Sequence, residues 1–290
     1  MKRVISVLLL FTFLKEGFTQ SEFFVLKTES NPFYDGVLTA FERWCECSLK
    51  VYDMQGKIEA GRELIKKERD RIKNMVVAVG TLAMRAIHEG LPEKNILCLL
   101  CMDPEYLDIP SYKVSGVSVF FDTAEVSKAI AEMLPEIKRG AILVSEKMVQ
   151  VGEEMRSILK FDLLISKNPM DSLQKISERE FEIIYFLPDP QTLNPTVYQT
   201  IVKLSKKKDF IIVAPSPAYL KIGGHMAFTP DLERAGKEGA RIMKDALSGG
   251  KGRFIRCPTN EVVINERAMA SKSYKTPKGF KVKITTEKEM

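Results

Sequence analysis

The pattern of apolar and polar residues predicts a repeated alternation of buried strands and amphipathic helices. Met75–Val79 and Ile96–Met102 are apolar throughout, which is typical of strands buried on both faces of a parallel sheet. Phe33–Cys45 and Lys57–Lys73 instead repeat apolar residues every three or four positions, as helices with one buried face do. Up to Met102 this order predicts a parallel sheet with helices on both faces.

The stretch Asn74–Glu89 (NMVVAVGTLAMRAIHE) is the clearest unit of this kind. Gly80 ends the apolar run, and Thr81 is predicted to cap a helix that continues through Leu82–His88. In open α/β sheets, ligands bind where a strand ends and the free N–H groups of the next helix begin. Gly80 and Thr81 are therefore candidate ligand contacts, with a plain helix cap as the alternative.

The second half repeats the alternation. Tyr112–Phe121 reads as an extended segment that crosses to a second domain, and strands such as Glu182–Leu187 and Phe210–Val213 follow between helices. Thr259–Ile264 is predicted as the last strand, with disorder beyond Val282. The sequence thus predicts two α/β units.

Polar residues follow strand ends in both halves. Two α/β units facing each other across such ends form a cleft, in which helix N-termini meet a carboxylate and acidic side chains meet an ammonium. Each position by itself is also explained by a cap or a turn. The candidate ligand-binding residues are Ser30, Asn31, Gly80, Thr81 and Asp103 in the first half and Asp189 and Ser216 in the second.

Composition narrows the class of protein. A chain of 290 residues with 45% hydrophobic content suits two globular domains. The net charge of +6 is spread over mixed charged helices, and the Lys206–Lys208 run fits a helix C-terminus, so no nucleic-acid partner is predicted. Met1–Arg3 is basic and Val4–Leu14 is apolar, which predicts a signal peptide over residues 1–20. The alternative is a buried N-terminal strand.

No catalytic or metal-binding motif stands out. His88 and His225 lie in no nucleophile or metal pattern, so the sequence predicts no enzyme, no cofactor and no metal. The chain has five cysteines, an odd number that argues against a complete disulfide framework. Because side chains alternate faces along a strand, Cys98 and Cys101 are predicted to be separate, buried small hydrophobes, with a zinc site as the alternative.

Several stretches together resemble the substrate-binding proteins of a bacterial ABC-transporter family of the tryptophan/tyrosine type. They are Asn31–Phe41 (NPFYDGVLTAF), Met75–Ile87 (MVVAVGTLAMRAI), Val114–Val119 (VSGVSV), Ile183–Asn194, Ile211–Ser216, Leu232–Gly250 and Val262–Asn265, in that order. The similarity covers nearly all of the chain after residue 21. Pro215 and Pro217 beside Ser216, a shortened second half and the lack of a lipobox cysteine depart from the family pattern.

The resemblance implies a type 1 periplasmic-binding-protein fold: two Rossmann-like, doubly wound parallel-sheet lobes joined by a three-crossover hinge. The expected lobes are residues 21–116 plus 229–257 and residues 117–228 plus 258–290. Hinge closure would trap a small organic solute, for which an amino acid is one candidate. A monomer is expected, which is periplasmic or otherwise exported and delivers the solute to an inner-membrane ABC permease. The alternatives are a ligand sensor or interaction protein with a degenerate cleft, and an enzyme of the doubly wound class.

Overall fold

The computed structural model describes residues 22–72 and 75–286. Its strands are β1 Glu22–Lys27, β2 Ser48–Asp53, β3 Val76–Val79, β4 Ile96–Cys101, β5 Val114–Phe121, β6 Gly140–Ser145, β7 Asp162–Ser166, β8 Ile183–Phe186, β9 Ile211–Val213, β10 Met226–Pro230, β11 Phe254–Cys257, β12 Thr259–Asn265 and β13 Lys281–Thr285. Its α-helices are α1 Pro32–Cys45, α2 Ile58–Glu68, α3 Thr81–Gly90, α4 Thr123–Met133, α5 Val149–Leu159, α6 Pro169–Ser177, α7 Pro195–Lys208, α8 Leu232–Leu247 and α9 Glu266–Met269. Short 3₁₀ helices are η1 Arg69–Arg71, η2 Pro104–Leu107, η3 Ser111–Lys113, η4 Glu146–Met148 and η5 Pro217–Ile222.

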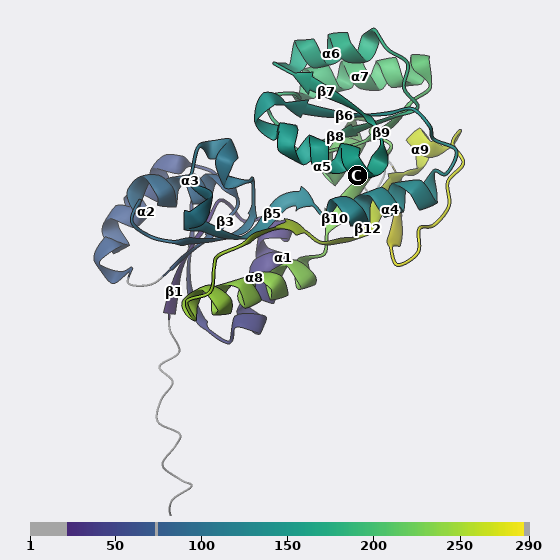
Figure 1. Ribbon diagram of the computed structural model, residues 1–290. Coiled ribbons are helices and arrows are strands. Elements are labelled where there is room, and N and C mark those ends of the chain that lie inside the picture. Colours follow the sequence, from purple (N-terminus) through teal and green to yellow (C-terminus); the bar gives the residue numbers. More distant parts are fainter. Residues whose placement is uncertain (1–21, 73–74, 287–290) are drawn as a thin grey trace, which may run out of the picture.

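The strands form two sheets, and each sheet is the centre of one lobe (Figure 1). The first sheet has the order β11-β5-β4-β3-β1-β2, and all of its pairs are parallel. The second has the order β13-β12-β10-β9-β8-β6-β7, and β12 pairs antiparallel with β10. The predicted fold class, two α/β lobes with doubly wound sheets, is confirmed.

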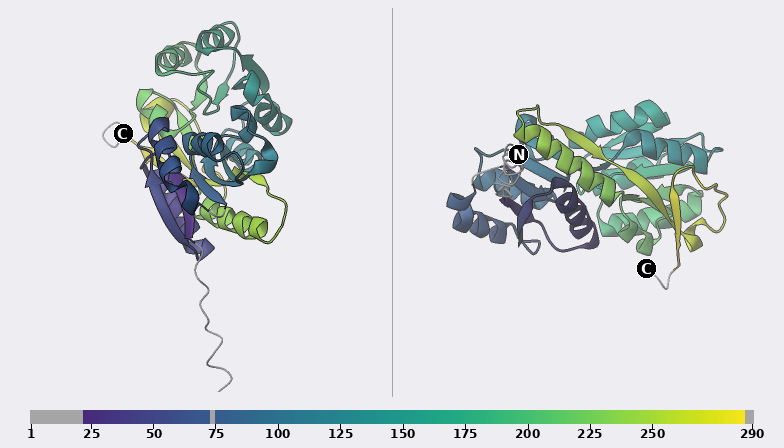
Figure 2. Two further views of the ribbon diagram at one scale, coloured as in Figure 1. Left: turned by 90° about the vertical axis from the view of Figure 1, so that its left-hand side faces the viewer. Right: turned by 90° about the horizontal axis from the view of Figure 1, so that it is seen from below.

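Helices cover both faces of each sheet, which explains why the strands are apolar throughout. In the first lobe α1 and α8 pack on one face, and α2 and α3 on the other. In the second lobe α4, α5 and α9 cover one face, and α6 and α7 the other. The views in Figure 2 show α8 with the first lobe, although it follows the strands of the second in sequence.

The chain passes between the sheets three times. It leaves the first sheet after β5, returns from β10 to β11 through α8, and leaves again between β11 and β12. These adjacent passages form the hinge. The residue limits proposed above for the two lobes stay a prediction.

The strand-turn-helix unit forms as predicted, but its cap differs. Gly80 is the N-cap of α3, with a φ of 86°, and Thr81 is the first helical residue. The Thr28 hydroxyl accepts a hydrogen bond from the Ala83 backbone N–H and so caps the helix from another strand's end. The expectation that Thr81 caps α3 is therefore wrong, because tertiary contact supplies the oxygen that the local sequence was expected to provide.

The cysteines also differ from expectation. Cys98 pairs with Cys101 and Cys45 with Cys47 in disulfides, while Cys257 is a buried free thiol. Leu100 has a φ of 55° and the register of β4 against β5 shifts beside it, which marks a β-bulge. The bulge interrupts the alternation of side chains, so Cys98 and Cys101 share the face packed by α2 and α3. The prediction of two separate hydrophobes is wrong for this reason.

The C-terminal region is more ordered than predicted. β13 pairs in parallel with β12 over Lys281–Thr285, where disorder was expected beyond Val282. The predicted signal peptide lies outside the described residues. No helix in the described ranges combines the length and apolarity needed to cross a bilayer.

Candidate functional site

The first-lobe candidates gather at one edge of the first sheet. Ser30 and Asn31 follow β1, Gly80 and Thr81 follow β3, and Asp103 follows β4. These three strands are adjacent and parallel, so their carboxyl ends meet at the same edge. We call this edge the first wall.

Lys27 is the central charge of the first wall. Its side chain is 10% exposed, and its Nζ lies 2.6 Å from Asp35 Oδ1 and 3.6 Å from Asp53 Oδ2. It also donates to the Ser30 hydroxyl at 2.8 Å, and that hydroxyl donates to Asp53. Although burial opposes it, hydrogen bonds from the Gln55 N–H and Ser30, together with Lys27, hold the pKa of Asp53 below its usual value. The Ser30 hydroxyl is thus already bonded within the wall.

Gly80 and Thr81 are also in close contact with other residues. A Cβ at Gly80 would lie 2.7 Å from both the Thr28 and the Tyr34 hydroxyl oxygens, so only glycine fits under Tyr34. The Thr81 hydroxyl accepts from the Met102 N–H at 2.9 Å, which ties α3 to the end of β4. The Asn31 side chain accepts from the N–H groups of Phe33 and Tyr34 and caps α1. These contacts join the strand ends of the first wall.

Asp103 is held by Arg256, which the sequence analysis did not identify. Arg256 Nη1 lies 2.8 and 2.6 Å from the two Asp103 carboxylate oxygens. Its Nε and Nη2 lie 3.0 and 2.9 Å from the carboxylate of Glu154 on α5 of the second lobe. Burial opposes the charge, but the bonds to Glu154 and the attraction of Asp103 raise the pKa of Arg256. Arg256 therefore bridges the lobes, and its signal was missed because β11 was not recognised as a strand.

Asp189 follows β8 in the second lobe and is 2% exposed. Its carboxylate accepts from the N–H of Ser145 at 2.8 Å and from that of Gln191 at 3.0 Å. Ser145 ends the adjacent strand β6, and its own buried hydroxyl has no hydrogen-bond partner among the described residues. Asp189 belongs to no ion pair in the described chain. We call the carboxyl ends of β6, β8 and β9 the second wall.

A segment of the first lobe, Asp103–Asp108, contacts the second wall, and we call it the bridging segment. Lys147 Nζ lies 3.1 Å from the Asp108 carboxylate and 5.9 Å from the centre of the Tyr106 ring. The Tyr106 hydroxyl interacts with the Asp189 carboxylate; burial, together with that carboxylate, raises the pKa of Tyr106 to about 12. The bridging segment thus places a neutral donor on Asp189.

Ser216 precedes η5 and borders a groove of about 400 Å³ between the lobes. Phe33 and Leu232 line it from the first lobe, and Pro217 and Leu220 from the second. The Ser216 hydroxyl makes no hydrogen bond among the described residues, unlike the hydroxyls of Ser30 and Thr81. The volume is within the range of small-molecule sites.

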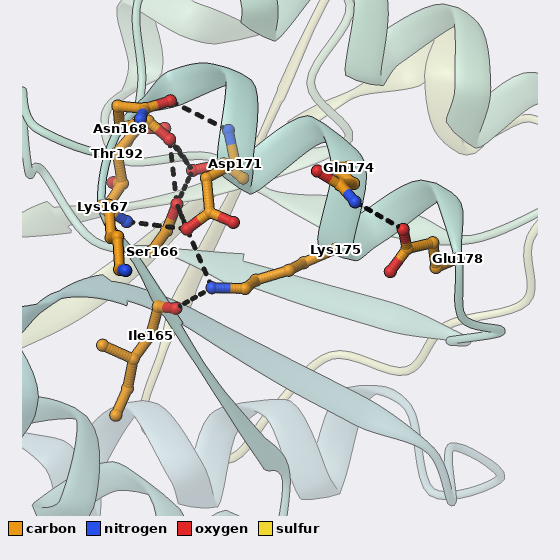
Figure 3. Close-up of polar contacts among 10 residues, drawn as sticks. Ile165, Ser166, Lys167, Asn168, Asp171, Gln174, Lys175, Glu178 and Thr192 are labelled. Atoms are coloured by element: carbon orange, nitrogen blue, oxygen red, sulfur yellow. Dashed lines mark hydrogen bonds and ion pairs between the residues drawn. The ribbon is translucent and has the colours of Figure 1, made fainter.

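The carboxyl end of β7 is closed by its own hydrogen bonds (Figure 3). The Asp171 carboxylate accepts from Lys175 Nζ and from the Lys167 N–H, both at 2.8 Å, and these bonds lower its pKa. The buried Ser172 hydroxyl donates to the Thr192 carbonyl at 2.8 Å. Asp171 therefore has the cation partner that Asp189 lacks.

Neither metal nor histidine chemistry is indicated. Residues 22–72 and 75–286 hold no cluster of acidic, cysteine or histidine side chains suited to a metal ion. His225 Nδ1 accepts from the Ile212 N–H, and burial lowers the pKa of His225 to about 4. This neutral, bonded imidazole fits the structural role predicted for it.

Comparison with known proteins identifies the fold. No protein-family model matches the chain, and no curated protein matches it. A ligand-free, open structure of CD0873, a substrate-binding protein with adhesive properties from Clostridium difficile, aligns with a TM-score of 0.67 at 15% identity, over 91% of this chain and 99% of that one. A Streptococcus pneumonia ABC domain in complex with L-Trp gives 0.60 at 15% identity, over 92% and 100%. A periplasmic ribose ABC transporter structure from Conexibacter woesei gives 0.54 at 13% identity, over 87% and 95%.

These similarities define the class of fold. The chain has the two-lobed architecture of type 1 periplasmic binding proteins, and it spans nearly the full length of the structures it resembles. At such low identity the similarity concerns the fold, and the function is argued from the site.

Proposed function

We propose that this protein is a solute-binding protein that traps a small organic molecule between its lobes. The observation that carries the proposal is the opposition of two sets of strand ends across an interlobe groove, next to a three-passage hinge. Ligands of open α/β sheets bind outside the carboxyl ends of the strands. Closure about a hinge is the usual way in which two such lobes enclose a ligand.

The proposed binding residues are Ser30, Asn31, Gly80, Thr81, Asp103, Asp189 and Ser216. Asp189 and Ser216 retain the most capacity for new contacts, since one has no counter-ion and the other no hydrogen bond. The five first-wall residues already bond or pack within the protein, so they contribute shape and position. An exported location, a monomeric state and an ABC permease as partner are part of the same proposal.

A thermal-shift screen with amino acids, amines and sugars tests this function. A ligand at 100 times its Kd that binds only the folded state adds about 2.7 kcal/mol of stability and raises the Tm. Thr81→Ala should reduce the shift, because it removes the hydroxyl that ties α3 to β4. Thr200→Ala, whose hydroxyl bonds only within α7, is the matched control. If no solute raises the Tm, the solute-binding function is rejected.

One observation favours a second function, an interaction or sensor protein with a degenerate cleft. The polar groups of the first wall bond one another, as the contacts of Lys27, Ser30 and Asp103 show. A wall of this kind offers a ligand few free donors or acceptors. This function predicts an unchanged Tm with every solute, and the same screen therefore separates the two.

A further inference from the structure

Asp189 differs from every other charge that lies between the lobes. Its side chain is buried, and its two hydrogen bonds come from backbone N–H groups, which are neutral. The Tyr106 hydroxyl, a third donor, is neutral as well, because its pKa is raised well above 7. A buried carboxylate without a cation is costly, since the protein interior solvates charge poorly. Asp189 is thus poised to accept a positive charge.

The cations between the lobes have no free charge to offer a carboxylate. Lys27 is paired with two aspartates, and Arg256 with Asp103 and Glu154. Lys147, which lies by the bridging segment, is paired with Asp108. A ligand carboxylate placed beside Asp189 would therefore add a second negative charge without a counter-ion.

The backbone offers no alternative anion site close to Asp189. The Ser145 and Gln191 N–H groups already donate to Asp189 itself. Across the cleft, the start of α3 is covered by Tyr34, whose hydroxyl lies against Gly80, and the Ala83 N–H is bonded to Thr28. The unpartnered hydroxyl of buried Ser145, at the adjacent strand end, is instead an acceptor that suits an N–H donor.

Two further lysines border the groove but lie too far away to serve an α-carboxylate. Lys221 and Lys283 line it beside Glu261, which is on β12. β12 is separated from β8 by β10 and β9, so at about 4.8 Å per strand the distance is roughly 14 Å. The amine and carboxylate of an α-amino acid are attached to one carbon, and both must lie near Asp189.

We propose that the interlobe site selects a small organic amine without an α-carboxylate, its ammonium bound to Asp189 and the Ser145 hydroxyl. This inference rests on the proposed solute-binding function and specifies its ligand class. The ammonium replaces the Tyr106 hydroxyl on Asp189 when the lobes part to admit the ligand. The zwitterionic amino acid is rejected because its carboxylate has no partner there.

The test compares amines with the amino acids from which they differ by one carboxylate. The pairs are tyramine with tyrosine, phenethylamine with phenylalanine, tryptamine with tryptophan, and cadaverine with lysine, measured by calorimetry and Tm on the whole chain at pH 7. We expect at least one amine to bind at least about tenfold more tightly than its amino acid, the minimum effect of an unpaired buried charge. Equal or tighter binding of the amino acids, or binding of sugars only, overturns the amine class and leaves the solute-binding function intact.

Variants identify the residue responsible. Asp189→Asn should weaken the amine at least about tenfold, and Asp162→Asn, at the opposite end of β7, should leave it unchanged. Tyr106→Phe removes the competing hydroxyl and should tighten amine binding about fivefold. Unchanged amine affinity in Asp189→Asn, or weaker binding in Tyr106→Phe, rejects the assignment to Asp189. The wild-type comparison of amine with amino acid stands even if a variant does not fold.

Discussion

The two walls of the cleft treat charge in opposite ways. In the first wall, Lys27 is neutralised by Asp35 and Asp53 and linked to Ser30. In the second wall, Asp189 is bonded to neutral donors alone. A closed network stabilises the fold and leaves little for a ligand, whereas an uncompensated buried charge costs stability and attracts one. The difference assigns structure to the first wall and binding to the second.

Removing the central cation of the first wall should have the largest effect on stability. Lys27→Met keeps the length of the side chain but leaves two aspartates facing each other, so the free energy of unfolding should fall by about 2 kcal/mol. Urea denaturation at pH 7 measures the change. Lys66→Met, at an exposed position of α2, is the control, and an equally small effect at both sites would contradict the structural role of the first wall.

Arg256, which joins the walls, should have the next largest effect. Arg256→Met leaves Asp103 and Glu154 without their shared cation and should lower the free energy of unfolding by about 1.5 kcal/mol. Small-angle scattering should show a larger radius of gyration, because the contact with the second lobe is lost. Arg241→Met, which breaks exposed pairs within α8, should cost less than about 0.5 kcal/mol and leave the radius unchanged. An unchanged radius in Arg256→Met would show that Arg256 does not hold the lobes together.

The smallest effect on folding is expected at Asp189. Asp189→Asn removes a charge that no cation offsets and keeps one acceptor oxygen for the Ser145 N–H. The free energy of unfolding should therefore change by less than about 1 kcal/mol. Urea denaturation beside Lys27→Met measures the contrast between the walls. A loss above about 2 kcal/mol would mean that Asp189, like Lys27, mainly stabilises the fold.

Much of the fold followed from local pattern. The apolar runs that became β3 and β8 are too hydrophobic for a solvent-exposed sheet, and the amphipathic stretches between them can only cover its faces. The same pattern located the strand ends, because a change from apolar to polar residues marks where a buried strand leaves the sheet. It placed Ser30, Gly80 and Asp103 correctly at one edge.

The partners of those residues depended on tertiary structure. Arg256 follows Asp103 by 153 positions, and Thr28 caps a helix residue 55 positions later. The bulge at Leu100, which brings Cys98 and Cys101 to one face, breaks the alternation on which strand patterns depend. The sequence alone thus determined which segments are buried and where polar residues emerge. Only the packed structure decided which charges are neutralised, because pairing depends on distances between segments that local pattern does not encode.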